Sequence, residues 1–258
     1  MLLGMRYLIL SDIHANYLAL EAVLNHAKRK RWDKVLFLGD AIGYYTHPNR
    51  VLELLRELSP EVCLIGNHED LYYQLRENPE LTSFREDGIV TDVIRRHVKE
   101  ISEDNDAFLN SFQPSAVMDS FQIAHGGLRS PWEYITTLQT AQDNAPLMET
   151  DLLFVGHTHV PRVFASVMIN NNEMWRTVAF RNEEQSFYRI PPKAKLIFNP
   201  GSVGQPRDGI PLASYVIFDE DTRSIELFRV EYDLLGTQRH VRELGYPEVL
   251  ASRLTVGK

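Results

Sequence analysis

Short apolar runs alternate with amphipathic stretches along the first third of the chain. Four-residue apolar runs at 7–10, 35–38 and 62–65 predict buried strands. Between the first two runs, apolar residues recur at helical spacing over 17–27, and Pro48 opens a second helical stretch before the third run. This order of strand, helix, strand, helix and strand predicts parallel strands joined by helical crossovers, and therefore an α/β fold.

The pattern changes in the rest of the chain. Residues 69–113 are charged and mostly helical in pattern, and they predict a helical segment over or beside a functional site. Later apolar or alternating runs predict strands at 121–124, 152–155, 162–169, 174–179, 195–198, 215–218 and 224–230. From Leu234 onward the pattern predicts helix. Because no repeat, low-complexity tract or linker interrupts the chain, we expect a single domain over 1–258.

Composition limits the class of protein. The chain has 258 residues, of which 44% are hydrophobic, so it can bury a sizeable core and is not disordered as a whole. Its 27 basic and 35 acidic residues give a net charge of −8, which disfavours specific nucleic-acid binding and attraction to anionic membranes. Cys63 is the only cysteine, which excludes an intrachain disulfide and a cysteine-based zinc site.

The N-terminal residues do not resemble a signal peptide or a membrane span. Arg6 interrupts the apolar run at 1–10, and no later stretch is long enough to cross a bilayer. We therefore expect a cytoplasmic protein with no membrane partner. Either Met1 or Met5 can serve as the first residue.

Polar residues directly follow five of the predicted strands. They are Asp12-Ile13-His14, Gly39-Asp40, Gly66-Asn67-His68-Glu69, His125-Gly126-Gly127 and Gly156-His157-Thr158-His159. Each segment alone has an ordinary explanation as a helix cap, a turn or a surface histidine. Ligands of open α/β sheets bind beyond the carboxyl ends of the strands, so the five segments together predict a functional rim.

The residue types on this rim suit two divalent cations. Imidazole and carboxylate ligands match manganese, iron, zinc, nickel or cobalt, and the sequence does not choose among them. Side chains two residues apart on an extended segment point the same way, as expected for Asp12 with His14 and for His157 with His159. Asp40 is the candidate bridging carboxylate. Two aspartates offset only two of the four positive charges, and the surplus suits a phosphate dianion and a hydroxide nucleophile.

At these residues the sequence resembles the calcineurin-like metallophosphoesterases. The family pattern is Asp-x-His, Gly-Asp, Gly-Asn-His-(Glu/Asp), a later His and Gly-His-x-His, and all five elements occur here in order. The segment 199–204 also resembles a family segment, so the resemblance spans at least 5–207. It implies a four-layer α/β/β/α sandwich with two mixed sheets and a site at one edge of both.

The resemblance also implies roles for individual residues. One metal ion would be held by Asp12, His14, Asp40 and His159, and the other by Asp40, Asn67, His125 and His157. His68 matches the catalytic histidine, which binds a phosphate oxygen and protonates the leaving group, with Glu69 or Asp70 to orient it. Phosphate esters would then be hydrolysed directly by a metal-activated hydroxide, with no phosphoenzyme.

The sequence leaves the substrate open. Asp40 is followed by Ala41-Ile42, whereas the protein Ser/Thr phosphatases continue with Asp-Arg-Gly, so the chain is more similar to the bacterial and archaeal branch. That branch includes phosphodiesterases, phosphomonoesterases and hydrolases of dinucleoside polyphosphates such as diadenosine tetraphosphate. We expect a phosphorylated small molecule or a nucleotide as substrate. A non-catalytic metal-binding scaffold is a further alternative, and the oligomeric state stays open.

Several residues outside the motifs are candidate substrate contacts. Arg129 and Arg207 are candidates to pair with phosphate alongside Asn67 and His68, although surface salt bridges are the more ordinary role for an arginine. The aromatic residues Tyr44, Tyr45, Trp132 and Tyr134 are candidates to stack on a base, with core packing as the more ordinary role. His47 is a weaker candidate for a substrate contact.

Overall fold

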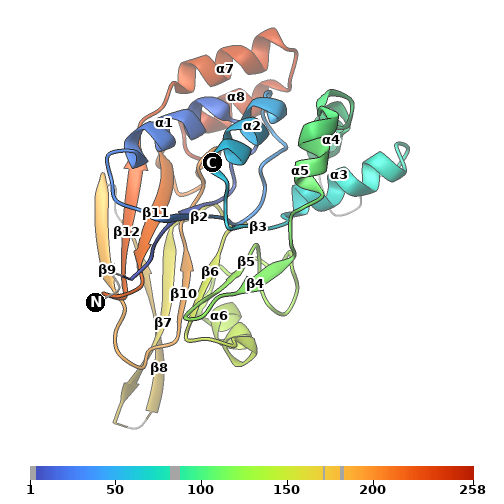
Figure 1. Ribbon diagram of the computed structural model, residues 1–258. Helices are drawn as coiled ribbons and strands as arrows, with labels where there is room; N and C mark the ends of the chain where they lie inside the picture. The colour runs from blue at the N-terminus through green and yellow to red at the C-terminus, as the bar shows by residue number, and fades with distance from the viewer. Residues whose placement is uncertain (1–3, 82–87, 171, 181–182) are drawn as a thin grey trace.

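Two mixed sheets of six strands form the centre of the protein (Figure 1). The computed structural model describes residues 4–81, 88–170, 172–180 and 183–258. The first sheet has the order β3 (Val62–Cys63), β2 (Lys34–Phe37), β1 (Arg6–Leu10), β11 (Ala213–Asp219), β12 (Ser224–Val230) and β9 (Gln185–Arg189). The second has the order β4 (Ser115–Val117), β5 (Gln122–Ala124), β6 (Leu152–Val155), β10 (Leu196–Asn199), β7 (Arg162–Ile169) and β8 (Asn172–Ala179).

Helices cover the outer faces of both sheets. The first sheet is covered by α1 (Tyr17–Ala27), α2 (Pro48–Leu58), α7 (Leu234–Glu243) and α8 (Glu248–Thr255) (Figure 1). The second sheet packs against α6 (Leu138–Asn144), which runs into the short 3₁₀ helix η1 (Ala145–Leu147). Beyond β3 lie α3 (Asn67–Glu77), α4 (Gly88–Glu100) and α5 (Glu103–Leu109). The predicted four-layer α/β/β/α sandwich is confirmed.

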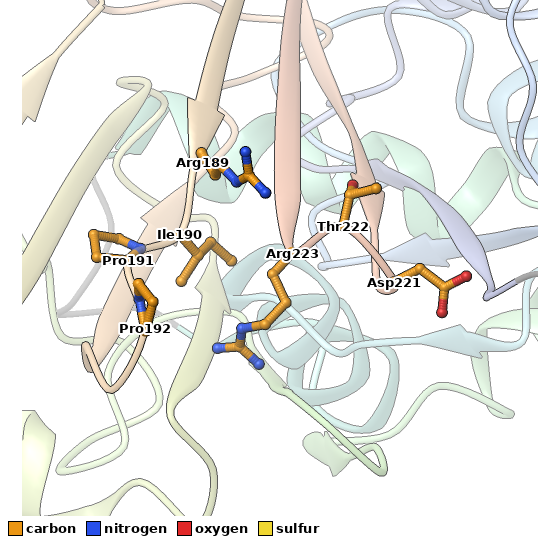
Figure 2. A pocket seen from close by; sticks show the side chains of 7 residues that line it. All are labelled: Arg189, Ile190, Pro191, Pro192, Asp221, Thr222 and Arg223. Carbon is orange, nitrogen blue, oxygen red and sulfur yellow. The ribbon is translucent and has the colours of Figure 1, made fainter.

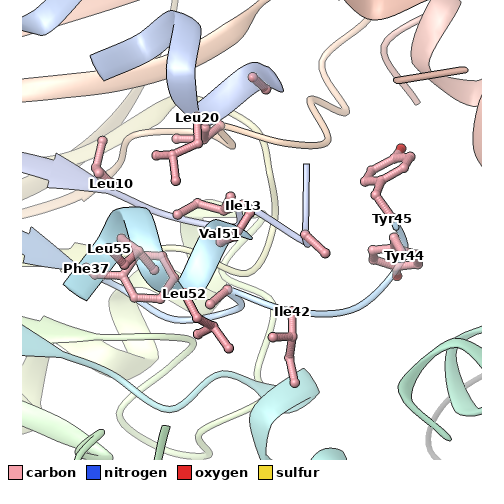
Figure 3. Packing of buried hydrophobic residues seen from close by; sticks show 14 of the residues in the cluster. Leu10, Ile13, Leu20, Phe37, Ile42, Tyr44, Tyr45, Val51, Leu52 and Leu55 are labelled. Atoms are coloured by element: carbon pink, nitrogen blue, oxygen red, sulfur yellow. The ribbon is translucent and has the colours of Figure 1, made fainter. Parts of the chain in front are cut away.

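The strands β1, β2 and β11 of the first sheet are buried on both faces because they lie between two layers. Along β1, Leu8 and Leu10 pack among the helices, whereas Ile9 packs between the two sheets. Figure 3 shows Leu10 and Phe37 among residues of the helical side. A strand covered on both sides needs apolar residues at every position, which is why these strands read as continuous apolar runs.

The strand directions place the ends of several strands together. β1 pairs parallel with β2, and β2 with β3, as the sequence predicts. In the second sheet, β6 pairs parallel with both β5 and β10. The residues that follow the carboxyl ends of β1, β2, β3, β5 and β6 carry the predicted metal ligands.

Some strands begin or end at other residues than predicted, because contacts with residues distant in the sequence set their ends. The third strand is predicted over 62–65 but ends at Cys63, because Ile65 N–H donates to the carbonyl of Gln113 (2.8 Å) rather than to a strand of the sheet. The strand predicted at 174–179 begins at Asn172. The sequence analysis missed β4, β9 and α6, which are short or half exposed.

The helical interpretation of 69–113 agrees with α3, α4 and α5, although residues 82–87 lie outside the described ranges. The single-domain organisation over 1–258 stays a prediction. In the described ranges, every helix is too short or too polar to cross a bilayer.

Candidate metal centre

The residues after the strand ends adopt backbone conformations that are unfavourable for their side chains. Positive φ angles between 53° and 65° occur at Asp12, His14, Asp40, His157 and His159. Such a conformation costs roughly 1–3 kcal/mol at a residue other than glycine and persists only where surrounding contacts impose it. Five such residues among the predicted ligands indicate that tertiary contacts hold these loops in place.

Main-chain hydrogen bonds join the loops after β1 and β2. The N–H of Asp12 donates to the carbonyl of Gly39 (3.0 Å), and the N–H of His14 donates to the carbonyl of Asp40 (2.9 Å). The two loops are therefore one unit, and the side chains of Asp12, His14 and Asp40 project from it together.

The segment 199–204 supports this unit from the second sheet. Ser202 Oγ donates to the carbonyl of Asp12 (2.7 Å), and Gly204 N–H donates to the same carbonyl (3.0 Å). A Cβ on Gly204 would lie 1.8 Å from the carbonyl oxygen of Ile13, so only glycine fits here. The sequence analysis noted this segment without assigning it a role, and the structure shows that it supports the Asp12 loop.

Four predicted ligands form the first cluster of donor atoms. Asp12, His14, Asp40 and His159 are buried and offer donor atoms within 4.8 Å of one another. Asp12 Oδ1 lies 3.3 Å from His159 Nε2, and Asp40 Oδ2 lies 3.7 Å from His14 Nε2. The first sheet supplies three of these residues, and the loop after β6 in the second sheet supplies His159.

A second cluster shares Asp40 with the first. Asp40, His125 and His157 also offer donor atoms within 4.8 Å of one another, and Asp40 Oδ2 lies 3.3 Å from His125 Nε2. The same oxygen of Asp40 therefore faces histidines of both clusters, which is one of the arrangements in which a carboxylate bridges two cations. Tyr134 stacks on the ring of His157 with the ring centroids 4.0 Å apart.

Each histidine of the two clusters donates one ring N–H to a backbone carbonyl. The acceptors are Ile42 for His14, Gln205 for His159, Leu38 for His125 and Trp132 for His157. A carbonyl can only accept, so the neutral ring carries its hydrogen on that side and its lone pair on the other. Metal-ligating histidines are held in the same way.

The second ring nitrogens of the four histidines, which do not donate to a carbonyl, face each other in two contacts. His14 Nε2 lies 3.1 Å from His159 Nε2, and His125 Nε2 lies 3.2 Å from His157 Nδ1. Two lone pairs at this distance repel unless a proton or a cation lies between them. Burial lowers the pKa of His14 well below its usual range, so a proton in the first contact is costly, whereas Asp40 raises the pKa of His125 to about 9, so a proton on His125 can take the place of a cation in the second contact. The donor set therefore fits metal cations.

The aspartates in the clusters carry negative charge. Burial alone would raise the pKa of Asp40, but the facing histidines outweigh it and hold that pKa well below the usual range. Burial would likewise lower the pKa of His125, but Asp40 outweighs it and raises that pKa to about 9. Asp40 thus attracts positive charge toward the position that both clusters share.

His68 lies beside the first cluster. Its main-chain N–H donates to Asp40 Oδ1 (3.0 Å). The centroid of its ring lies 4.6 Å from that of His14 and 4.7 Å from that of Tyr44. Its Nδ1 is buried and has no hydrogen-bond partner among the described residues. Asn67 is the first residue of α3 and is buried next to it.

Glu69 holds main-chain groups in place, whereas the family resemblance offered it as one of two candidates to orient His68. Its carboxylate accepts main-chain N–H groups from Gly66 (2.8 Å), Asp40 (2.8 Å) and Ala41 (2.9 Å). None of these hydrogen bonds involves the ring of His68. Burial raises the pKa of Glu69 to about 7. The side chain joins the start of α3 to the loop after β2, a role that its position after Gly66-Asn67-His68 does not reveal.

The two candidate arginines lie in different environments. Arg129 is exposed and pairs with Asp143 (2.6 Å) and Glu133 (3.3 Å), so it is not part of the convergent group. Arg207 is half-buried and donates to Tyr44 Oη (3.0 Å) and to Gln205 Oε1 (2.7 Å). The main-chain N–H of Arg207 donates to the carbonyl of His159 (3.2 Å), which places Arg207 next to the first cluster.

A separate cavity of about 370 Å³ lies at the other end of the first sheet (Figure 2). It is lined by Arg189, Ile190, Pro191, Pro192, Asp221, Thr222 and Arg223. Because β11 runs antiparallel to β1, its end at Asp219 lies beside Arg6, at the start of β1. This cavity is therefore remote from the residues that follow Leu10.

Known proteins are similar to this chain over most of its length. Residues 5–223 match the family model described as the calcineurin-like phosphoesterase superfamily domain. The chain is 36% identical over 259 residues to an uncharacterized protein of Methanocaldococcus jannaschii, with 97% of each chain covered.

Solved structures are similar over almost the whole chain. A metallophosphoesterase from Sphaerobacter thermophilus is 35% identical, with a TM-score of 0.82 over 99% of this chain and 100% of that one. A hypothetical protein from Pyrococcus horikoshii is 16% identical, with a TM-score of 0.74 over 98% of both chains, and it shares the fold.

Proposed function

Since the chain belongs to the calcineurin-like phosphoesterase superfamily, we propose that it hydrolyses phosphate esters at the two clusters joined by Asp40. Two divalent cations would be held there by Asp12, His14, Asp40 and His159, and by Asp40, Asn67, His125 and His157. Bound cations would supply Lewis acidity and lower the pKa of bound water, to about 7 in favourable cases. The main support is the pair of buried donor clusters that share Asp40, together with the 3.1 Å contact between the ring nitrogens of His14 and His159.

The proposed role of His68 is to bind a phosphate oxygen and to return a proton to the leaving oxygen. Burial lowers the pKa of His68 to about 4, so the neutral ring is the resting form. A phosphate dianion beside the ring favours the protonated form and thereby makes it an acid. The ring contact with Tyr44 and the hydrogen bond from the main-chain N–H of His68 to Asp40 hold His68 beside the first cluster.

Arg207 is the proposed phosphate-binding arginine. Its two side-chain acceptors, the phenol of Tyr44 and the amide of Gln205, are neutral. No carboxylate pairs with it in the described parts of the chain, so its positive charge is free to attract phosphate. Arg129 is left out of this proposal because two acidic side chains already neutralise it.

The test is a metal-reconstituted activity screen. Manganese, iron, nickel, cobalt and zinc forms are assayed on p-nitrophenyl phosphate, bis(p-nitrophenyl) phosphate and diadenosine tetraphosphate, which separate monoester, diester and anhydride hydrolysis. At least one metal form should turn over at least one substrate. His68→Gln should lower kcat by about 100-fold or more, the usual contribution of a general acid. The control His240→Gln, on α7 away from the clusters, should stay within about twofold of that activity.

Two metal ions bound without turnover of any substrate would favour the scaffold alternative over the enzyme. Full activity in His68→Gln would refute the role of that histidine while leaving the metal centre intact.

A further inference from the structure

Tyr44 has a constrained position between the two clusters and the C-terminal helix α8. Its φ angle is +54°, and its ring lies 4.7 Å from the rings of both His14 and His68. His97 of α4 holds both neighbours of Tyr44: it accepts the N–H of Gly43 (3.2 Å) and donates to the carbonyl of Tyr45 (2.9 Å). Figure 3 shows Tyr44 and Tyr45 at the end of the segment that also carries Ile42.

Two guanidinium groups lie over the ring of Tyr44. The carbon at the centre of the Arg207 guanidinium is 5.6 Å from the ring centroid, and that of Arg253 is 5.4 Å from it. These distances are within the range of cation–π contacts. Arg207 also donates to Tyr44 Oη, so the phenol hydrogen is free to point to another acceptor.

Arg253 reaches this ring because the end of the chain is anchored beside Arg207. Gly209 N–H donates to the carbonyl of Gly257 (2.9 Å), and a Cβ on Gly257 would lie 2.6 Å from the nitrogen of Ile210. Arg253 Nε donates to the main-chain oxygen of Lys258 (2.7 Å). The two terminal nitrogens of the Arg253 guanidinium make no hydrogen bond or ion pair to any described residue.

The local charge contrasts with the charge of the whole chain. The net charge is −8, and exposed arginines such as Arg242 and Arg129 are paired with acidic side chains. The acidic residue next to Arg207 in sequence, Asp208, is paired with Arg229 (2.6 Å). Among the described residues, no aspartate or glutamate side chain forms an ion pair with Arg207 or Arg253. Two guanidinium groups that lack an acidic side-chain partner make this part of the protein locally positive, which favours an anionic ligand.

We propose that Arg253, with Tyr44 and Arg207, forms a second anion subsite beside the metal clusters, for a substrate that carries a phosphate or carboxylate in addition to the scissile phosphate. Arg207 lies nearer the clusters and binds the scissile phosphate, and Arg253 binds the additional anion. Both guanidinium groups lie over the ring of Tyr44, which offers its O–H to either anion. This inference rests on the proposed function, whose substrate class it narrows to phosphorylated molecules with two anionic groups.

The experiment compares two ligands that differ by a single charge. Glycerol 3-phosphate and 3-phosphoglycerate have the same three-carbon frame, but the second has a carboxylate in place of an alcohol. Their affinities for the manganese-loaded protein are measured by calorimetry, a readout that does not depend on turnover. The variants are Arg253→Gln, Arg253→Lys and the control Arg242→Gln, which removes an equal charge from the neighbouring helix α7.

The native protein and Arg242→Gln should bind 3-phosphoglycerate about tenfold more tightly than glycerol 3-phosphate. Arg253→Gln should reduce this ratio to near one while its affinity for glycerol 3-phosphate changes less than twofold, and Arg253→Lys should retain part of the preference. Equal affinities in the native protein, or equal losses for both ligands in Arg253→Gln, would overturn the proposal. Hydrolysis is not needed for either result, so failure of the phosphoesterase proposal is seen separately, in the activity screen.

Discussion

At the scale of single residues, buried polar side chains hold the site in place. Glu69 accepts N–H groups from Asp40 and from Gly66 at the start of α3, and His97 accepts from one neighbour of Tyr44 and donates to the other. Neither side chain is among the predicted ligands, and both are buried. Their loss would leave buried N–H or carbonyl groups without partners, which costs about 1–3 kcal/mol each.

His97 makes the stability of the protein depend on pH. Burial lowers the pKa of His97 to about 3, from an ordinary value of 6.5. The unfolded chain therefore binds this proton more readily than the folded one, and the stabilisation present above pH 6.5 is lost as the pH falls toward 3. Between pH 6.5 and 5 the loss is about 2 kcal/mol, since one pKa unit corresponds to about 1.4 kcal/mol.

Urea denaturation of the native protein and of His97→Gln at pH 7 and pH 5 measures this effect. The variant has no ionisable group at position 97, so the difference in unfolding free energy between the two proteins should shrink at pH 5. A difference that stays constant between the two pH values would show that His97 is not the group responsible.

At the scale of elements, the site depends on contacts between loops that follow different strands. The segment 199–204, which follows β10, supports the loop after β1 through Ser202 and Gly204. These contacts impose the positive φ angles of Asp12 and His14. The geometry of the ligands is thus set by neighbouring elements, because the local preferences of these residues oppose it.

Gly204→Ala should disturb the first cluster from a distance. The new Cβ would lie 1.8 Å from the carbonyl oxygen of Ile13, so the loop after β1 must shift. We expect the unfolding free energy to fall by about 2 kcal/mol, as for other overpacked sites, and the affinity for Mn²⁺ to fall as well. Denaturation and metal titration measure the two effects.

Gly88→Ala is the control, because a Cβ at that position has no atom of the described residues within 4 Å. Its stability should be unchanged or slightly higher, since alanine favours helix. Unaltered stability and metal affinity in Gly204→Ala would mean that the segment 199–204 does not support the site.

At the scale of the whole molecule, the two clusters join the two sheets. Asp12, His14 and Asp40 follow strands of the first sheet, and His125, His157 and His159 follow strands of the second. A cation bound between them would link both sheets in the folded state only. Metal binding should therefore stabilise the whole fold.

Saturating Mn²⁺ should raise the melting temperature of the metal-free protein. At a concentration 100 times the Kd, the added stability is about 2.7 kcal/mol for one site. Asp40→Asn should lose most of this increase, because Asp40 belongs to both clusters. The control Asp143→Asn, on α6, should keep it, since Asp143 pairs with Arg129 away from the clusters. A full increase in Asp40→Asn would contradict a shared carboxylate.

The sequence by itself determined the layers of the fold and the candidate ligands. Continuous apolar runs such as 7–10 identify strands buried on both faces, and the polar residues after them identify the rim, because both signals are local in the chain. The ordered motifs from Asp12 to His159 carry the family resemblance, which the family model confirms.

Only the tertiary structure decided how distant residues meet. It pairs His14 with His159 and His125 with His157, directs Glu69 to the Asp40 loop, and brings Arg253 over Tyr44. It also separates Arg129 from Arg207, although each follows a glycine-containing motif. These outcomes depend on contacts between residues far apart in the chain, and no local pattern of hydrophobic and polar residues encodes them.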